Sequence, residues 1–170
     1  DNVLAQTFAT RRPNQAWVTD ITYVPTVEGW LYLAGVKDLY TCEVVGHAMN
    51  ARMTTDLVSE ALRKALTTKR PGPGLLHHSD RGSQYCAQDY QEQLRQFGLV
   101  PSMSRKGNCY DNAPMESFRG TLKNELVHHR RYATRAQARH EIAEYIEPFY
   151  NRQRRHSRLG NLSPVAFAQP

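Results

Sequence analysis

Three acidic residues stand where fold stability alone does not require them. Asp20 lies inside the apolar stretch WVTDITYV (17–24), Asp80 follows the apolar run LLHH (75–78), and Glu116 lies early in a helical segment, beside its apolar stripe. Singly, Asp80 could be a cap or turn residue, and Glu116 a carboxylate favoured by the helix dipole. Asp20 is harder to explain, because Asp is disfavoured inside strands. Jointly they suggest a site for a hard cation such as Mg²⁺ or Mn²⁺, which prefers oxygen ligands.

The chemistry of such a site follows from its charge. If the strand that holds Asp20 pairs with the strand before Asp80, both carboxylates reach one edge of the sheet. Two such charges ~4 Å apart repel by roughly 4 kcal/mol at an effective dielectric of 20, so a cation is needed to neutralise them. Two ions ~3.5–4 Å apart activate an attacking oxygen and stabilise the leaving oxygen at phosphorus. The acids therefore indicate phosphoryl transfer with two Mg²⁺ or Mn²⁺ ions.

The elements that must position these acids follow from periodicity. Residues 17–24, 30–40 and 43–49 are apolar, rich in β-branched and aromatic residues and joined by short turns, which predicts an antiparallel meander. The remaining prediction is a helix over 54–69, a strand over 75–78, a helix near 87–97, a strand over 99–103 and helices beginning at Pro114 and Thr134. The order βββαβαβαα predicts an α/β sandwich with a mixed five-stranded sheet.

Local signals refine the helices. Thr54 or Thr55 can cap the first helix, and Thr134 with Gln137 matches a capping box. Pro148 should kink or end the last long helix. A Ser-Pro pair starts a short terminal turn at 163–164. The predicted core face of the last helix is Ala138, Ile142, Tyr145, Ile146 and Phe149, and the aromatic residues predicted to be core are Trp17, Trp30, Tyr32 and Tyr40.

Composition fits one domain with a real core and a polyanionic partner. The 170 residues are 40% hydrophobic, and the three cysteines form no paired motif, which favours reduced thiols in an intracellular protein. Residues 1–100 hold 10 basic and 10 acidic residues, whereas 101–170 hold 12 basic and 6 acidic ones. We expect a leading linker over 1–14, the core over 15–150 and a basic tail over 151–170 that packs on the core. No apolar run approaches the ~18 residues of a membrane span.

Five motifs in order resemble a known family. They are WVTDITYV, GWLYLAGVKDL, HSDRGSQY, SMSRKGNCYDNAPMESFRGTLKNEL and YNRQRRHSRLGNLSP, and 35 residues separate Asp80 from Glu116. From about residue 8 to the C-terminus the chain resembles the bacterial insertion-sequence-three family of DDE transposases. The resemblance implies an RNase H-like fold in which Asp20, Asp80 and Glu116 are catalytic and bind the metal. It also implies that a 3′-OH freed at the end of an insertion element attacks another DNA strand.

The resemblance carries further expectations about partners. Family members have a separate N-terminal helix-turn-helix region that reads the element ends. We therefore expect these 170 residues to bind DNA weakly and with little specificity. A homodimer or higher oligomer on DNA is expected, because two DNA ends need coordination. The expected place of action is the bacterial cytoplasm, in association with the nucleoid, with no membrane and no zinc.

Basic residues around the acids are the candidate DNA contacts. Lys123 lies two helical turns after Glu116, where such enzymes hold a DNA end, although a solvated surface lysine is the alternative. Gly120, between them, would let the DNA backbone approach closely. Charge-assisted contacts to phosphate are also expected from basic residues elsewhere in the chain. These candidates are Arg105, Lys106, Arg119, Arg152, Arg154 and Arg155.

A second group is expected to orient the acids. Adjacent strand residues point to opposite faces, so His77 and His78 do not easily ligate one zinc ion. One of them should pack inside and the other lie near the site. The candidates to support the acids are His78, Arg81, Ser83 and Asn112. Two other functions remain open: an RNase H-type nuclease that cuts without joining, and a non-catalytic DNA-binding module.

Overall fold

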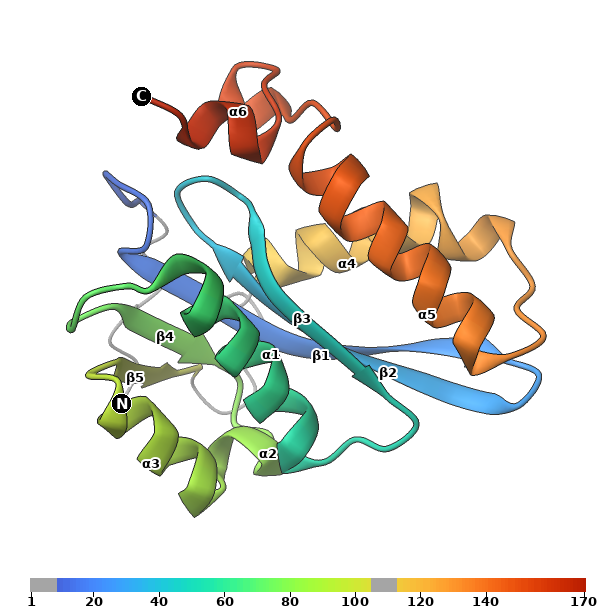
Figure 1. Ribbon diagram of the computed structural model, residues 1–170, viewed down its shortest axis with the longest axis horizontal. Coiled ribbons are helices and arrows are strands. Elements are labelled where there is room, and N and C mark those ends of the chain that lie inside the picture. Colours follow the sequence, from blue (N-terminus) through green and yellow to red (C-terminus); the bar gives the residue numbers. More distant parts are fainter. Residues whose placement is uncertain (1–8, 105–112) are drawn as a thin grey trace.

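A mixed five-stranded sheet forms the centre of the molecule. The computed structural model describes residues 9–104 and 113–170. The sheet order is β3-β2-β1-β4-β5. β1 (Ala16–Thr26), β2 (Gly29–Asp38) and β3 (Val44–Asn50) pair antiparallel, whereas β4 (Leu76–Ser79) runs parallel to β1, and β5 (Val100–Met103) runs parallel to β4 (Figure 1). The predicted meander followed by two parallel strands is confirmed.

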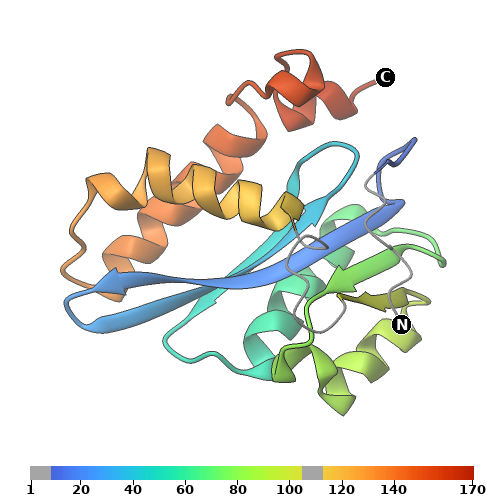
Figure 2. The ribbon, with the colours of Figure 1, turned by 180° about the vertical axis from the view of Figure 1, so that it is seen from behind.

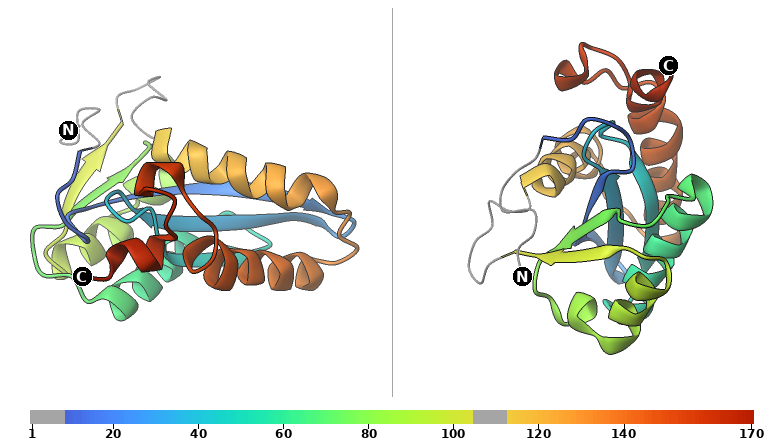
Figure 3. Two further views of the ribbon diagram at one scale, coloured as in Figure 1. Left: turned by 90° about the horizontal axis from the view of Figure 1, so that it is seen from above. Right: turned by 90° about the vertical axis from the view of Figure 1, so that its left-hand side faces the viewer.

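Helices cover both faces of this sheet, which confirms the α/β sandwich. α1 lies in front of the sheet in Figure 1, and α4 lies in front in the view from behind (Figure 2). Seen from above, the strands run between these two helices (Figure 3). In chain order the helices are α1 (Thr55–Lys69), α2 (Ser83–Cys86), α3 (Gln88–Gln96), α4 (Ala113–Glu125), η2 (Val127–His129), α5 (Arg135–Glu144), η3 (Tyr145–Asn151), η4 (Ser157–Leu159) and α6 (Pro164–Ala168). Within the described residues, no helix is long and apolar enough to cross a membrane.

Alternation along the central strands divides the core in two. Trp17 packs with residues of α1 and α3 on one face, whereas its neighbour Val18 packs with α4, α5 and η3 on the other. Gly46 lets α1 lie directly on β3, because a Cβ there would meet the backbone of Ala61 and Ala65. The close packing of α1 therefore depends on one strand glycine.

The last long helix differs from its prediction at Pro148. The chain does not break there, because Tyr145–Asn151 continues the helix in π form, which absorbs the proline. The wider turn shifts the buried face by one residue, so Tyr150 is buried and Phe149 is 38% exposed. The assignment of Phe149 to the core was therefore wrong. Trp30 was also wrongly assigned, because it is 49% exposed beside the β1–β2 turn.

The capping predictions held in part. Thr134 accepts a hydrogen bond from the Gln137 amide at 3.1 Å, and Ser163 accepts one from the Ala166 amide at 3.3 Å. Thr54 occupies the N-cap position of α1 without a side-chain cap bond. Two of the three helix starts are thus fixed by the side chains that the sequence indicated.

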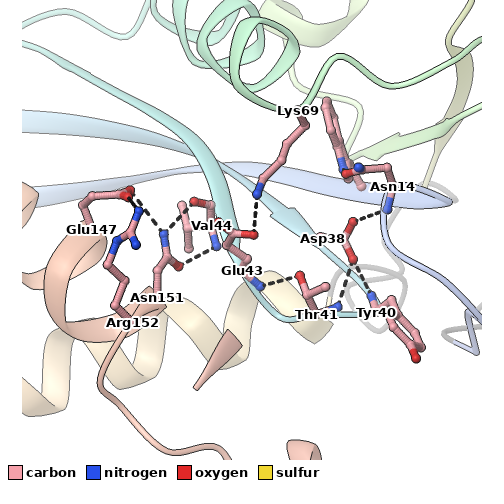
Figure 4. A network of polar contacts seen from close by, with 11 residues as sticks. Asn14, Asp38, Tyr40, Thr41, Glu43, Val44, Lys69, Glu147, Asn151 and Arg152 are labelled. Carbon is pink, nitrogen blue, oxygen red and sulfur yellow. Dashed lines mark hydrogen bonds and ion pairs between the residues drawn. The ribbon is translucent and has the colours of Figure 1, made fainter. Parts of the chain in front are cut away.

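A polar network joins the C-terminal part of the chain to the sheet (Figure 4). The buried Asn151 amide accepts a hydrogen bond from the Val44 amide at 2.9 Å and donates one to the Val44 carbonyl at 3.0 Å. In the turn before β3, the Asp38 carboxylate accepts bonds from the amides of Tyr40 and Thr41. The end of η3 is therefore fixed to the start of β3.

Candidate active site

Two of the three acids lie side by side just beyond the point where β1 and β4 stop pairing. β1 and β4 are parallel, and their last paired residues are Val18 and His78. Asp20 and Asp80 each stand two residues further along, where the two strands stop pairing. Residues at the same offset along two parallel strands lie level with each other. The predicted juxtaposition of Asp20 and Asp80 therefore follows from the observed register.

Asp20 is a buried carboxylate with a cationic partner. Its Oδ2 lies 2.9 Å from an Arg119 guanidinium nitrogen on α4. Burial raises the pKa of Asp20 to about 6, against the lowering effect of Arg119, and the charges of Asp80 and Glu116 raise it further. Both other acids thus lie close enough to act electrostatically on Asp20. A carboxyl group whose pKa is shifted by burial and by nearby charges is typical of functional sites.

Asp80 is held by the tight turn that follows β4. Its Oδ1 accepts a hydrogen bond from the Gly82 amide at 2.7 Å. A Cβ at Gly82 would lie 2.9 Å from the same oxygen, so the turn brings the backbone against the carboxylate. The neighbouring Arg81 donates from Nε to the Ser104 carbonyl at 2.7 Å. The turn is therefore anchored to the end of β5.

The histidine pair supports this turn from inside. His77 and His78 are both buried, so the expectation that only one packs inside needs correction. His77 bonds the Tyr90 hydroxyl at 2.7 Å, and burial lowers its pKa to about 4. His78 bonds the Ser102 and Ser104 hydroxyls at 2.9 and 3.1 Å. Through Ser104, His78 joins the residues that anchor the Asp80 turn.

α4 carries Glu116 and packs on β2, the strand whose Gly35 pairs with Asp20. Gly35 on β2 pairs with Asp20 across the sheet, and a Cβ at Gly35 would lie 3.3 Å from the Met115 side chain. The missing side chain lets α4 approach β2 closely at this level. Glu116, next to Met115, is exposed on the outer side of the helix. Arg119 follows one turn later and reaches back to Asp20.

The carboxylates offer the right donors for a divalent cation but are not gathered into one cage. Asp20, Asp80 and Glu116 supply only oxygen ligands, and burial raises the pKa of Asp20 in spite of the nearby Arg119. Among residues 9–104 and 113–170, no group of three His, Cys, Asp or Glu side chains is placed to hold an ion. Arg119 is the cation that Asp20 contacts here. The donor chemistry of the three acids therefore fits a hard divalent cation such as Mg²⁺ or Mn²⁺.

The candidate DNA contacts on α4 lie on its open side. Lys123 has its Nζ 4.9 Å from the centre of the Tyr23 ring, a cation–π contact that leaves it half-buried. A Cβ added at Gly120 would meet nothing within 4 Å, so this side of the helix faces open space. Glu116, Gly120 and Lys123 thus share one accessible stripe.

Several of the remaining candidates already have protein partners. Arg154 binds both carboxylate oxygens of Glu125, and Arg152 lies 3.5 Å from Glu147. Arg155 and Ser83 are exposed. Arg105, Lys106 and Asn112 lie outside the described residues.

Sequence reasoning missed a tyrosine at this site. The buried Tyr85 hydroxyl lies 3.1 Å from the Thr19 hydroxyl, next to Asp20 in the chain. Burial raises the pKa of Tyr85 well above 10, and the charges of Asp20 and Asp80 contribute. Tyr85 therefore lies beneath the acids as a neutral hydroxyl. The motif HSDRGSQY contains it, but an aromatic residue there reads as core.

Comparison with solved structures identifies the fold. The chain superimposes with a TM-score of 0.79 and 17% identity on a chain of the simian T-cell lymphotropic virus intasome, covering 95% of this chain and 58% of that one. It superimposes with a TM-score of 0.74 and 14% identity on the HTLV-2 integrase catalytic core domain, solved in complex with magnesium, covering 95% and 100%. The RNase H-like fold of retroviral integrase cores is therefore confirmed.

Sequence relatives are proteins of bacterial insertion elements. The chain is 66% identical over 168 residues to an uncharacterized 31 kDa protein of insertion element IS600 from Shigella sonnei, covering 99% of this chain and 62% of that protein. It is 48% identical to the IS904 transposase of Lactococcus lactis and to the transposase InsF of IS3A from Escherichia coli, and covers 66% and 58% of their lengths. The chain thus spans about three fifths of these relatives. Residues 10–109 and 98–164 match two descriptions of the integrase core domain, and the chain belongs to the integrase core domain family.

Proposed function

We propose that this chain is the catalytic core of a DDE transposase, which cleaves DNA at the ends of an insertion element and joins the freed 3′-OH to another strand. The observation that carries the proposal is the register that sets Asp80 level with Asp20, with Glu116 on α4 close enough to raise the pKa of Asp20. The retroviral integrase fold and the transposase relatives support it. The nuclease and binding-module alternatives lack this combined support.

The proposed chemistry assigns distinct tasks to the residues. Two divalent ions, when bound, would supply the activation of the attacking oxygen and stabilise the leaving oxygen. Asp20, within β1, and Asp80, directly after β4, would hold one side of that site, and Glu116 would close it from α4. Arg119 would leave Asp20 and turn towards phosphate, for which its guanidinium has matching geometry. Lys123 and Gly120 would then lie along the DNA end.

The remaining residue roles, the oligomeric state and the place of action are proposed from the same similarity to transposases. We propose that the phosphate contacts also include Arg105, Lys106, Arg152, Arg154 and Arg155, and that His78, Arg81, Ser83 and Asn112 support the acids. We propose that the protein acts as a dimer or higher oligomer on DNA in the bacterial cytoplasm, at the nucleoid. Residues 1–14 would then act as a linker, and 151–170 as a basic tail on the core.

A joining assay tests the proposed function. A labelled DNA end with a free 3′-OH is incubated with supercoiled plasmid and Mg²⁺ or Mn²⁺, and transfer of label to the plasmid is measured. We expect joined product from the wild type and none from Asp80→Asn, with Glu144→Gln, an exposed carboxylate, as the matched control. Hydrolysis without joined product would identify a nuclease instead. Equal activity in Asp80→Asn would remove the catalytic assignment.

A further inference from the structure

A polar cavity lies on the flank of α4 opposite Arg119. Its volume is about 240 Å³. The β2 end and its turn contribute Lys37 and Cys42, and α4 contributes Pro114, Ser117 and Thr121. Tyr150, Arg154, His156, Ser157 and Arg158 line it from the C-terminal part of the chain. Residues distant in sequence thus enclose one basic cavity.

Lys37 at the base of this cavity is a buried cation without a counter-ion. Its side chain is 4% exposed, and its Nζ donates one hydrogen bond, to the Pro114 carbonyl at 3.1 Å. Among the described residues, no carboxylate forms an ion pair with it. Burial lowers the pKa of Lys37 against the raising effect of Cys42, and the charges of Arg158 and Arg154 lower it further. Buried charges are normally paired, so this site lacks an anion.

Two lining residues from the C-terminal tail also have polar atoms that lack a partner among the described residues. Arg158 is exposed and, within the part of the chain described by the structure, has no ion pair. The His156 Nε2 is buried and has no hydrogen-bond partner there either. Arg154 is the exception, because Glu125 neutralises it with two bonds at 2.8 and 2.9 Å. Two uncompensated cations and an unpartnered ring nitrogen therefore converge on one space.

The chemistry of the lining selects a phosphate. An ammonium group, a guanidinium group and the hydroxyls of Ser117 and Thr121 are the donors that proteins use for DNA backbone oxygens. Pro114, Ser117 and Thr121 lie at i, i+3 and i+7 and share one flank of α4, whereas Arg119 reaches Asp20 from the other. A strand that crosses α4 at the exposed Glu116 and Ser117 would therefore meet both sides.

We propose that this cavity binds a backbone phosphate of a DNA strand, with Lys37 and Arg158 as its cationic contacts. The inference rests on the proposed function for the choice of DNA. It adds a phosphate site that is separate from the carboxylates and built partly by the tail. A retained buried lysine also implies a stability cost, because an apolar side chain of similar shape suits a buried site better than an unpaired charge.

The salt dependence of DNA binding tests the proposal. Binding of the full chain to a short fluorescent duplex is measured by anisotropy over a range of salt concentrations, without divalent metal. We expect Lys37→Met and Arg158→Gln each to reduce the slope of log K against log[salt] by about 1 and to weaken binding about tenfold at low salt. Arg63→Gln, an exposed arginine of α1, is the matched control and should bind like the wild type.

Thermal unfolding separates binding from structure. Lys37→Met should unfold at the same or a higher temperature, because it removes a buried charge. A lower unfolding temperature with an unchanged salt slope would show that Lys37 only supports α4, and would overturn the proposal. If Lys37→Met does not fold, the exposed Arg158 decides: an unchanged slope in Arg158→Gln overturns the proposal, and a reduced slope supports it.

Two further experiments show whether the phosphate site or the proposed function fails, if one of them does. Inorganic phosphate is titrated without DNA while the unfolding temperature is measured. If phosphate raises this temperature for the wild type but not for Lys37→Met, and the salt slopes of DNA binding are unchanged, the cavity binds a small phosphate instead. Asp80→Asn should keep the wild-type salt slope while it loses joining. A cavity-dependent slope in a protein that joins no DNA would therefore refute the proposed function and retain the phosphate site.

Discussion

Replacing Asp20 by asparagine should stabilise the metal-free protein at neutral pH. The folded protein holds the Asp20 proton more tightly than the unfolded chain, because the pKa rises from 3.8 to about 6. The protonated acid therefore contributes stability below pH 3.8, and this contribution is lost as the pH rises through about 6. Asparagine has nearly the same shape and does not titrate.

The expected magnitude follows from the size of this shift. Each pKa unit corresponds to about 1.4 kcal/mol, so ionised Asp20 costs the folded state about 3 kcal/mol above pH 6. That cost already includes the attraction of Arg119, whose side chain is 33% exposed and can be hydrated when the pair is lost. Asp20→Asn should therefore gain up to about 3 kcal/mol at pH 7 and almost nothing below pH 4.

Urea unfolding at a series of pH values, with EDTA present, measures this difference. Glu144→Gln is the control, because Glu144 is exposed and its removal should leave the profile unchanged. Adding Mg²⁺ or Mn²⁺ should stabilise the wild type more than Asp20→Asn. The reasoning is refuted if Asp20→Asn is equally or less stable than the wild type at pH 7, or if the difference does not depend on pH.

Three other predictions concern neighbouring elements. In the Asp20→Asn background, the free energy of unfolding should fall by about 3 kcal/mol as the pH drops from 6.5 through 4. Burial lowers the pKa of His77 to about 4, so the stability that neutral His77 contributes is lost through that range. A flat profile would contradict this. Asn151→Ala should cost about 2–4 kcal/mol in urea unfolding, since the buried Val44 amide and carbonyl lose their partners, whereas the exposed Gln153→Ala should cost little. Gly120→Ala should stabilise α4 by about 1 kcal/mol and weaken DNA binding, and unchanged anisotropy would show that DNA does not approach there.

The sheet and the acid positions were accessible from sequence because local patterns determine them. Apolar runs rich in β-branched and aromatic residues, joined by short turns, specified the meander, and the parallel pairing of β4 with β1 then placed Asp80 level with Asp20. Short helices such as α2 were not predicted, because four residues give no periodicity. The π turn at Pro148 was not predicted either, and it moves Phe149 out of the core. The spacing of apolar residues in a sequence does not reveal where a helix adopts this wider turn.

Contacts between residues far apart in the sequence could not be predicted either. The pairing of Arg119 with Asp20 depends on how closely α4 approaches β2, which Gly35 permits. The motif GVKDL contains Lys37, but a lysine in an apolar strand gives no sign that Arg158 faces the same cavity. Residue type thus predicted the acids, whereas the neutralising and basic partners required the three-dimensional arrangement.

A structure with Mn²⁺ and a DNA end tests the central claim most directly. The anomalous signal of manganese locates the metal without reference to any assumed ligand. We predict a peak held by the carboxylates of Asp20 and Asp80, with Glu116 drawn in and Arg119 displaced from Asp20. Carboxylates that stay apart, with Arg119 still on Asp20 and manganese elsewhere, would contradict the account.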